Sequence, residues 1–360
     1  MKLFEELDKL TDQGYLRKVI SPCGELVLYN YTDHCTFKKH WNNLTLGARG
    51  TTYNIETGEV VAKAFPKFFN FGELEPPIQK AILNERNFQV FEKMDGSLGI
   101  VYNYKGEWRV NTRGSFTSEQ AIRATEMLKK YDLSNINPRF TLLVEIIYPE
   151  NRIIVDYGDE EKLVLLAAMC GQATEATYVQ LEGMAMIAGM EVCPKLEFET
   201  IDELIGYTDG LSAMEEGFVA RFRDGFRIKF KSAEYLKLAR LMSNMTPLNF
   251  WRNMTNGIVD QEAIEKLPEE FREEVDRQVA DIQQKYQEVK KEVEEDFRYA
   301  IQSIGGLTEL EDDRKALGLW LKENGGELKH AGAMFPRLLN SGAGIDKYIM
   351  KSIRPRDNVL

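Results

Sequence analysis

The hydrophobic pattern of the chain changes near residue 238, and this change limits the folds that its 360 residues can adopt. Residues 40–232 contain many short apolar runs separated by glycine turns, a pattern that predicts β-strands. Two helices are expected within this part, over residues 77–86 and 118–131. Beyond residue 238 the strand pattern ends. The sequence therefore predicts an α+β domain over residues 1–238, followed by an all-α domain over residues 239–360.

A long amphipathic helix is expected in the second domain. Apolar residues recur every three or four positions between Phe271 and Ala300, which places them on one face of a helix of about 30 residues. Pro268 occupies a suitable first helical position. A further helix is predicted over residues 312–323. Packing inside a helical domain explains the apolar face better than a coiled-coil partner surface does.

The Lys-x-Asp-Gly sequence from Lys93 to Gly96 is the most informative short motif. An apolar run ends just before the lysine, the Asp-Gly pair indicates a turn, and a second apolar run follows from Leu98 to Tyr104. A lysine fixed at a strand end beside a tight turn can be directed at a phosphate and can take a nucleotide covalently. The motif is short, however, and a solvated lysine at a hairpin turn also explains it.

Further motifs lie on both sides of Lys93 in a fixed order. They are Gly47–Thr51, Phe65–Asn70, Asn111–Phe116, Leu142–Ile146, Glu215–Phe222 and Arg227–Ser232. Over residues 40–240 the set resembles the covalent nucleotidyltransferase superfamily of ligases and capping enzymes. It is most similar to the phage-type ATP-dependent RNA ligases that reseal cleaved tRNA anticodon loops. Capping enzymes and DNA ligases usually carry an arginine two residues after the motif glycine, whereas Leu98 stands there in this chain.

The resemblance implies both a fold and a reaction. The fold is an ATP-grasp-like nucleotidyltransferase domain with antiparallel sheets, followed by a helical domain that contributes to substrate choice. The reaction joins the 5′-phosphate and 3′-hydroxyl ends of single-stranded RNA through a covalent lysyl-AMP and an RNA-adenylate. A DNA ligase, an mRNA capping guanylyltransferase and an inactive RNA-binding module remain the alternatives.

The chemistry requires a neutral lysine amine. An unperturbed lysine has a pKa of about 10.4, so forming its neutral amine at pH 7 costs about 4.6 kcal/mol. Burial and neighbouring positive charge lower such a pKa, so we expect cations close to Lys93. The candidates are Arg49, Lys67, Arg113, Lys229, Lys231 and a bound metal ion. The same cations would neutralise charge on the transferring phosphoryl group.

Lys229 and Lys231 are informative because of their spacing. Two alternating apolar runs are joined through Asp224-Gly225, which predicts a β-hairpin. Residues two apart on a strand share a face, so both lysines should point the same way and Phe230 the other way. The polar outer face of an edge strand is the alternative. The functional interpretation is a pair of ammonium groups that bind triphosphate oxygens.

Glu145 and Glu216 are the candidate metal ligands. Glu145 interrupts an apolar strand, where a carboxylate is costly to bury unless it is paired or binds a metal ion. A salt bridge to a core arginine is the alternative for Glu145. The resemblance implies that Glu145 contacts metal or ribose and that Glu216 binds the metal. Mg²⁺ suits oxygen ligands and phosphates, with Mn²⁺ as the other candidate.

The resemblance assigns roles to the remaining residues. Lys93 is the nucleophile, Asp95 orients the RNA 3′ end or the sugar, and Lys229 and Lys231 complete the catalytic set. Gly96 and Gly217 let the backbone approach the nucleotide closely. The implied nucleotide contacts are Arg49, Lys67, Glu92, Lys93, Gly96, Arg113, Glu145, Glu216, Val219, Lys229 and Lys231.

Charge and composition fit this interpretation. The net charge of −11 argues against a general nucleic-acid coat protein. Between Arg221 and Arg240, however, seven basic residues face two acidic ones, a local net of +5. A basic groove on an acidic body fits an enzyme that binds a short stretch of RNA. No apolar run reaches the ~18 residues of a membrane span, and the first residues lack a signal-peptide core. We expect a monomer in the cytoplasm, which is the host cytoplasm if a phage encodes the chain.

Overall fold

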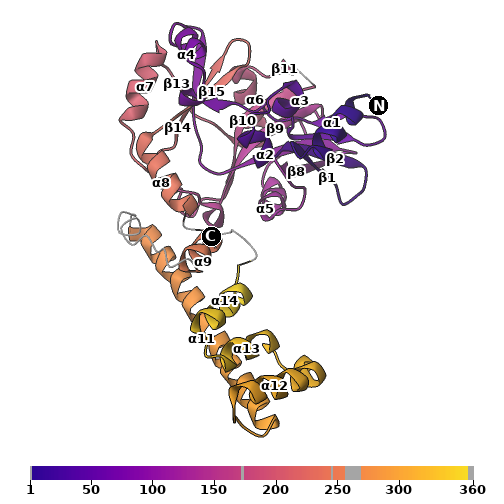
Figure 1. Ribbon diagram of the computed structural model, residues 1–360. Helices are drawn as coiled ribbons and strands as arrows, with labels where there is room; N and C mark the ends of the chain where they lie inside the picture. The colour runs from indigo at the N-terminus through magenta and orange to yellow at the C-terminus, as the bar shows by residue number, and fades with distance from the viewer. Residues whose placement is uncertain (1, 172–173, 245, 256–268, 356–360) are drawn as a thin grey trace. The chain divides into compact units, whose positions relative to one another are not determined.

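The computed structural model describes residues 2–171, 174–244, 246–255 and 269–355 (Figure 1). Pro268 lies outside these residues, as do the side chains of Phe271 and Val275. The chain divides into two compact units, residues 1–237 and residues 238–360. The first unit contains three sheets and the second is helical among its described residues. The predicted fold class, α+β followed by all-α, is confirmed.

A six-stranded sheet forms the centre of the first unit. Its order is β11-β10-β9-β7-β8, and β12 pairs with β10. The strands β9 and β10 are almost continuously apolar because both faces of the sheet are covered, and seven of the eight residues of β9 are buried. The bounds are β7 Ser97–Tyr104, β8 Glu107–Thr112, β9 Phe140–Ile147, β10 Lys162–Cys170, β11 Thr174–Glu175 and β12 Glu191–Val192.

A five-stranded sheet has the order β13-β6-β14-β15-β5. Its strands are β5 Phe69–Asn70, β6 Phe88–Glu92, β13 Lys195–Leu196, β14 Gly217–Phe222 and β15 Arg227–Lys231. The predicted hairpin at Asp224-Gly225 is confirmed, since β14 and β15 pair antiparallel and Gly225 adopts a φ of 85°. The edge-strand alternative for β15 is wrong, because β5 pairs with its outer side.

A four-stranded sheet, β1-β2-β3-β4, completes the first unit. It comprises β1 Leu16–Ile20, β2 Leu26–Tyr31, β3 Arg49–Asn54 and β4 Val60–Ala62. Leu7 of α1 packs with Leu16 and Val27 in a separate small core. In Figure 1 this sheet and α1 lie on one side of the first unit, and β14 and β15 with α4 and α7 lie on the other.

Both helices expected in the first unit are present. They are α4, Pro76–Leu83, and α5, Glu119–Leu128, whose N-cap is Ser118. The remaining helices of this unit were not predicted. A capping box between Thr177 and Gln180 starts α6, and this signal is readable in the sequence. These helices are α1 Lys2–Asp12, α2 Asp33–Phe37, α3 Asn43–Gly47, α6 Tyr178–Ala188 and α7 Ile201–Asp209, and α8 Ala233–Asn244 begins in this unit and ends in the second.

The second unit is built on α11, Glu269–Ser303, which confirms the predicted long helix. Val293, Phe297 and Ala300 of its apolar face are buried against α12 and α13. The remaining helices are α9 Pro247–Thr255, α12 Leu310–Asn324, α13 Met334–Leu338 and α14 Gly342–Ser352. Among the described residues, none of the helices combines the length and the apolar character that crossing a membrane requires.

Candidate active site

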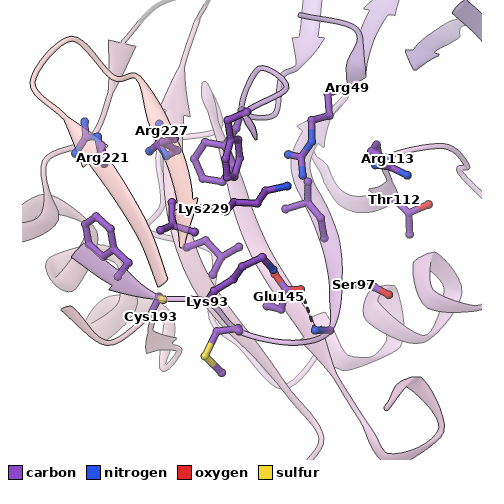
Figure 2. Close-up of a pocket in the computed structure, with 18 of the residues that line it drawn as sticks. Arg49, Lys93, Ser97, Thr112, Arg113, Glu145, Cys193, Arg221, Arg227 and Lys229 are labelled. Atoms are coloured by element: carbon purple, nitrogen blue, oxygen red, sulfur yellow. Dashed lines mark hydrogen bonds between the residues drawn. The ribbon is translucent and has the colours of Figure 1, made fainter. Parts of the chain in front are cut away.

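Lys93 lies in a cavity of about 550 Å³ that is lined by residues from both larger sheets (Figure 2). The lysine follows the end of β6, and β7 begins at Ser97. Because β6 and β7 belong to different sheets, the segment from Lys93 to Gly96 crosses from one sheet to the other. The hairpin alternative for Lys93 is therefore wrong.

Glu216 holds two lysines at once. Its Oε2 lies 2.6 Å from Lys93 Nζ, and its Oε1 lies 2.7 Å from Lys231 Nζ. Only 3% of the Glu216 side chain is exposed, so both ion pairs are shielded from water. The backbone N–H of Lys93 also donates to the carbonyl oxygen of Gly217 at 2.8 Å. These contacts fix the lysine to the start of β14.

The carboxylates around Lys93 raise its pKa. Burial acts to lower the pKa, but the charges of Glu216, Glu145 and Asp95 outweigh it. Burial thus acts in the expected direction, and the neighbouring carboxylates, which the expectation left out, act against it. A lysine acts as a nucleophile only as the neutral amine, so in that role Lys93 would need the carboxylate charge to be offset.

Glu145 lies at the centre of the cavity on the inner strand β9 (Figure 2). It is buried, and its Oε1 accepts a hydrogen bond from the Gly96 N–H at 3.1 Å. Burial raises the pKa of Glu145 to about 7, although Lys93 acts in the opposite direction. Among the described residues no ion pair joins Glu145 to an arginine, so the salt-bridge alternative is wrong.

Gly96 and Gly217 are required by the protein's own backbone. A Cβ on Gly96 would lie 2.7 Å from the carbonyl oxygen of Ile146. Gly217 has a φ of 124°, and a Cβ there would lie 2.1 Å from the carbonyl oxygen of Phe230. Both glycines therefore allow strands to meet behind the cavity, and this suffices to explain them without a nucleotide contact.

Asp95 is buried, and its two carboxylate oxygens bind other parts of the protein. Oδ2 accepts hydrogen bonds from the backbone N–H groups of Ile154 and Val155, both at 2.9 Å. Oδ1 accepts one from the Tyr235 hydroxyl at 2.8 Å. These contacts hold the Lys93 segment in place, and the contact of Asp95 with the RNA end or the sugar stays a prediction.

Lys229 and Arg49 lie on the opposite side of the cavity from the carboxylates and flank Phe68. Lys229 Nζ is 4.8 Å from the ring centroid, and the Arg49 guanidinium is 5.4 Å from it. Among the described residues no carboxylate pairs with Lys229. Burial, with repulsion from Lys67, Lys93 and other cations, lowers its pKa to about 7. Arg49 Nη1 is buried without a hydrogen-bond partner among the described residues. Both groups are arranged to receive an anion.

Lys67 and Arg113 adjoin this cation side and both contact Tyr31. The Lys67 ammonium lies 4.9 Å from the Phe69 ring centroid and 5.9 Å from those of Tyr31 and Trp41. Arg113 Nη1 donates to the Tyr31 hydroxyl at 2.9 Å. The aromatic rings hold both cations without adding a carboxylate.

Comparisons with known proteins identify the family. A family model described as RNA ligase matches residues 47–235, more than half of the chain. The chain belongs to the RNA ligase family. RNA ligase 1 of Bacteriophage TS2126 is 28% identical over 209 residues, which cover 54% of this chain and 52% of that protein. The motif resemblance to phage-type RNA ligases is thereby confirmed.

Other relatives agree with this RNA ligase assignment. A protein of Autographa californica nuclear polyhedrosis virus, with the name "Putative bifunctional polynucleotide kinase/RNA ligase", is 28% identical over 264 residues, 63% of this chain and 37% of that protein. The chain thus spans between about a third and a half of the length of these two relatives. The solved structure titled "Archaeal ATP-dependent RNA ligase - form 2" matches the fold with a TM-score of 0.51 and 18% identity, over 77% of this chain and 75% of that one.

Most of the site residues predicted for this RNA ligase family member meet in the cavity. The predicted residues that line it are Arg49, Glu92, Lys93, Gly96, Arg113, Glu145, Val219 and Lys229. Glu216 is joined to it by the ion pair with Lys93, and Lys231 is paired with Glu216. Lys67 acts on Lys229 electrostatically. Asp95 is not among the lining residues, and its carboxylate binds Ile154, Val155 and Tyr235.

Sequence reasoning missed two parts of the RNA ligase cavity. At one end, Glu175 of β11 forms ion pairs with Arg221 and Arg227, and these pairs join the two larger sheets. At the other end stands Arg17 of β1 with several hydroxyl groups. Neither part carries a local signal, since β11 has two residues and Arg17 lies before the matched segment.

Glu145 and Glu216 offer a donor set that fits Mg²⁺ or Mn²⁺. Such an ion commonly uses one or two carboxylates and takes its other ligands from water and substrate phosphates. Among the described residues no group of three or more potential metal-ligating side chains is present. Lys93 and Lys231 already bind Glu216, whereas Glu145 has no ion-pair partner among these residues.

Proposed function

We propose that this chain is an ATP-dependent RNA ligase that joins 5′-phosphate and 3′-hydroxyl RNA ends through a lysyl-AMP on Lys93. The observation that carries the proposal is the position of Lys93. It lies in the cavity between buried carboxylates and an opposing group of cations, in a chain of the RNA ligase family.

Three steps follow from this arrangement. Lys93 Nζ attacks the α-phosphorus of ATP, and pyrophosphate leaves. The 5′-phosphate of an RNA strand then attacks the same phosphorus, and the bond to Lys93 breaks. Finally a 3′-hydroxyl attacks the activated 5′-phosphate, AMP leaves and the strand is sealed. In each step negative charge gathers on phosphoryl oxygens that the cation side can stabilise.

The cation side supplies the triphosphate contacts in this proposal. Lys229 and Arg49 carry ionic groups without protein carboxylate partners among the described residues, so a triphosphate provides the missing counter-charge. Lys67 and Arg113 extend the same surface. Val219 faces the cavity beside Phe91, where an apolar contact with the base is available.

The carboxylate side controls the nucleophile. Glu145 and Glu216 would hold a divalent ion, which offsets their charge on Lys93 and the charge of the phosphates. Glu216 also orients Lys93 through their 2.6 Å contact. Asp95 keeps the Lys93 segment in place through its three hydrogen bonds.

The substrate proposal is RNA with a broken strand, including a cleaved tRNA anticodon loop. The residue two places after Gly96, Leu98, favours an RNA ligase over a DNA ligase or capping enzyme, as does the helical second unit. We assign the adenylyltransferase chemistry to residues 1–238 and RNA recognition to residues 239–360.

Intact mass after incubation with ATP and Mg²⁺ tests the proposal. Wild-type protein and a Lys195→Ala control on β13 should gain one adenylyl group, and Lys93→Ala should gain none. Pretreatment with pyrophosphate removes any AMP that the purified protein already carries. Retention of the adenylyl group by Lys93→Ala would refute the assignment of the nucleophile. Labelling by GTP in place of ATP, or sealing of nicked DNA in place of RNA, would favour the alternatives.

A further inference from the structure

One end of the cavity is made of cations and hydroxyl groups. We call it the Arg17 end, and its residues are Arg17, Thr112, Arg113, Gly114, Ser115 and Ser118. The carboxylates that line the cavity lie elsewhere: Glu92 and Glu145 flank the Lys93–Gly96 segment, and Glu175 is paired at the opposite end. In Figure 2, Thr112 and Arg113 lie on the side of Glu145 away from Arg221 and Arg227.

The protein holds Arg17 at the cavity by a specific contact. Arg17 comes from β1, and its Nη2 donates to the carbonyl oxygen of Gly114 at 3.0 Å. A Cβ on Gly114 would lie 1.9 Å from that nitrogen, so a side chain at position 114 would displace the guanidinium. The contact uses one of five N–H donors, and among the described residues the other four have no protein acceptor.

The groups around Arg17 suit a phosphate. Arg113 is held by Tyr31. The Ser115 and Ser118 hydroxyl oxygens accept hydrogen bonds from the N–H groups of Thr117 and Ala121, so their hydroxyl hydrogens are the groups that can donate to a ligand. A planar guanidinium binds two phosphate oxygens at once, and hydroxyl donors complete such a site. The absence of lining carboxylates at this end, among the residues that the structure describes, removes the main source of repulsion toward an anion.

The direction of Lys93 identifies the side of the cavity on which phosphates take part in the reaction. In phosphoryl transfer the attacking and leaving atoms lie roughly in line with the phosphorus. Lys93 reaches into the cavity toward the side where Ser97, Thr112 and Arg113 lie (Figure 2). A group that displaces Lys93 from its AMP must therefore approach from that side, toward which pyrophosphate also leaves in the first step. Because Lys229 and Arg49 hold the pyrophosphate in the proposed function, the Arg17 end is left for the RNA phosphate.

We propose that the Arg17 end binds the terminal 5′-phosphate of the RNA strand, with Arg17 as the residue that distinguishes a 5′-phosphate from a 5′-hydroxyl. This inference rests on the proposed ligase function and extends it to the second step. A 5′-phosphate oxygen forms a bond to the AMP phosphorus, the phosphorus–nitrogen bond to Lys93 breaks, and the amine regains its electron pair. Of the two substrates, Arg17 contacts only the RNA 5′-phosphate and does not contact ATP.

The test compares two oligoribonucleotides of one sequence, with a 5′-phosphate or a 5′-hydroxyl, by fluorescence anisotropy on adenylylated protein in EDTA, so that AMP is not transferred during the measurement. We expect wild type to prefer the phosphorylated strand by about 10- to 100-fold, the worth of a charged hydrogen-bond pair. Arg17→Ala should remove this preference. Gly114→Ala, which keeps the arginine but displaces it, should do the same, and Arg17→Lys should retain part of it. Lys18→Ala is the matched control, because Lys18 is the next residue and is paired with Asp8.

Each outcome decides the inference. An unchanged preference in Arg17→Ala and Gly114→Ala would overturn it. So would a loss of self-adenylylation as large as the loss of preference, because Arg17 would then serve the ATP triphosphate. The same oligoribonucleotides can be measured on protein without AMP. A wild type that never takes AMP but still prefers the 5′-phosphate through Arg17 would refute the ligase function and keep the binding site.

Discussion

Lys229 and Lys231 lie two residues apart on the same face of β15, but their surroundings differ. Lys231 is paired with the buried carboxylate of Glu216 at 2.7 Å. Lys229 faces Phe68 and other cations, and its pKa is lowered to about 7. One lysine belongs to a completed ion-pair network, and the other belongs to a group of cations that lacks a counter-ion among the described residues. The two sides of the cavity differ in the same way: the lysines on the carboxylate side are paired with Glu216, and the cations on the cation side lack a carboxylate partner among the described residues.

The difference separates two tasks of one active site. On the carboxylate side, ion pairs fix Lys93 in place but raise its pKa, so the proposed nucleophile is oriented and protonated. On the cation side, buried positive charge without a counter-ion is unfavourable, so binding of an anion there is favoured. In the proposed mechanism, a bound triphosphate therefore neutralises the charge of the cation side. A divalent ion that offsets the carboxylates lowers the pKa of Lys93. Four experiments can break or sharpen this comparison.

The largest effect is expected for Lys229→Met. Removal of a cation that stabilises the transferring phosphoryl group should slow self-adenylylation about 10²- to 10³-fold. Single-turnover incorporation of labelled AMP measures this rate, with Lys18→Ala as a surface control. A loss below tenfold would show that Lys229 is dispensable on the cation side.

Gly217→Ala tests the carboxylate side through the backbone. The new Cβ would overlap the Phe230 carbonyl oxygen at a φ of 124°, so we expect the free energy of unfolding to fall by about 3 kcal/mol. Gly183→Ala in α6 is the control, because its Cβ would meet nothing within 4 Å and should stabilise the helix by about 0.5–1 kcal/mol. Urea titration measures both. Equal stability of the two variants would contradict the steric argument.

The adenylylation rate should rise with pH between 6 and 8. The raised pKa of Lys93 makes its neutral fraction grow about tenfold per pH unit. Glu145, with a pKa of about 7, becomes an ionised ligand over the same interval and adds to the slope below pH 7. Single-turnover rates at saturating ATP and Mg²⁺ measure the profile. A rate that is flat or falls with pH would contradict the carboxylate control of Lys93.

The smallest effect concerns stability without substrate. The folded-state pKa of Lys229 lies below its unfolded value of about 10.4, so protonated Lys229 favours the unfolded chain. This destabilisation is complete below pH 7 and fades as the pH rises toward 10.4. Lys229→Met should therefore raise the free energy of unfolding by about 1 kcal/mol at pH 6 and by less at pH 9.

The matched variant for that experiment is Lys231→Met. It leaves the buried Glu216 with one partner instead of two, so its stability should fall. Urea titrations of both variants at pH 6, 7.5 and 9 give the comparison. If Lys229→Met and Lys231→Met change stability in the same direction, the two sides of the cavity do not differ in the way described.

The parts of the site that local patterns determine could be predicted from the sequence. Alternation along β15 predicted the shared face of Lys229 and Lys231, and Asp224-Gly225 predicted the hairpin that carries them. The burial of Glu145 followed from its apolar neighbours. Each of these features depends on residues within a few positions of one another.

Features that depend on distant pairing could not be predicted. The Lys93 segment resembles a hairpin turn locally, but β6 pairs with β14, more than 100 residues away, and this pairing places β6 and β7 in different sheets. Asp95 meets Tyr235 across 140 residues. The pKa of Lys93 depends on three carboxylates from separate segments, so its direction could not be read from the set of nearby cations.

The four-stranded sheet determines how much of the chain a fragment or a chimera must include. The segment that defines the family begins at residue 47, after β1 and β2. A fragment cut there would leave β3 without the partner that covers one edge, and it would lose Leu26 and Leu28, whose side chains are fully buried. An open edge beside an apolar surface promotes aggregation. Chimeras and minimal enzymes should therefore keep residues 1–237 together, even though the recognisable family sequence is shorter.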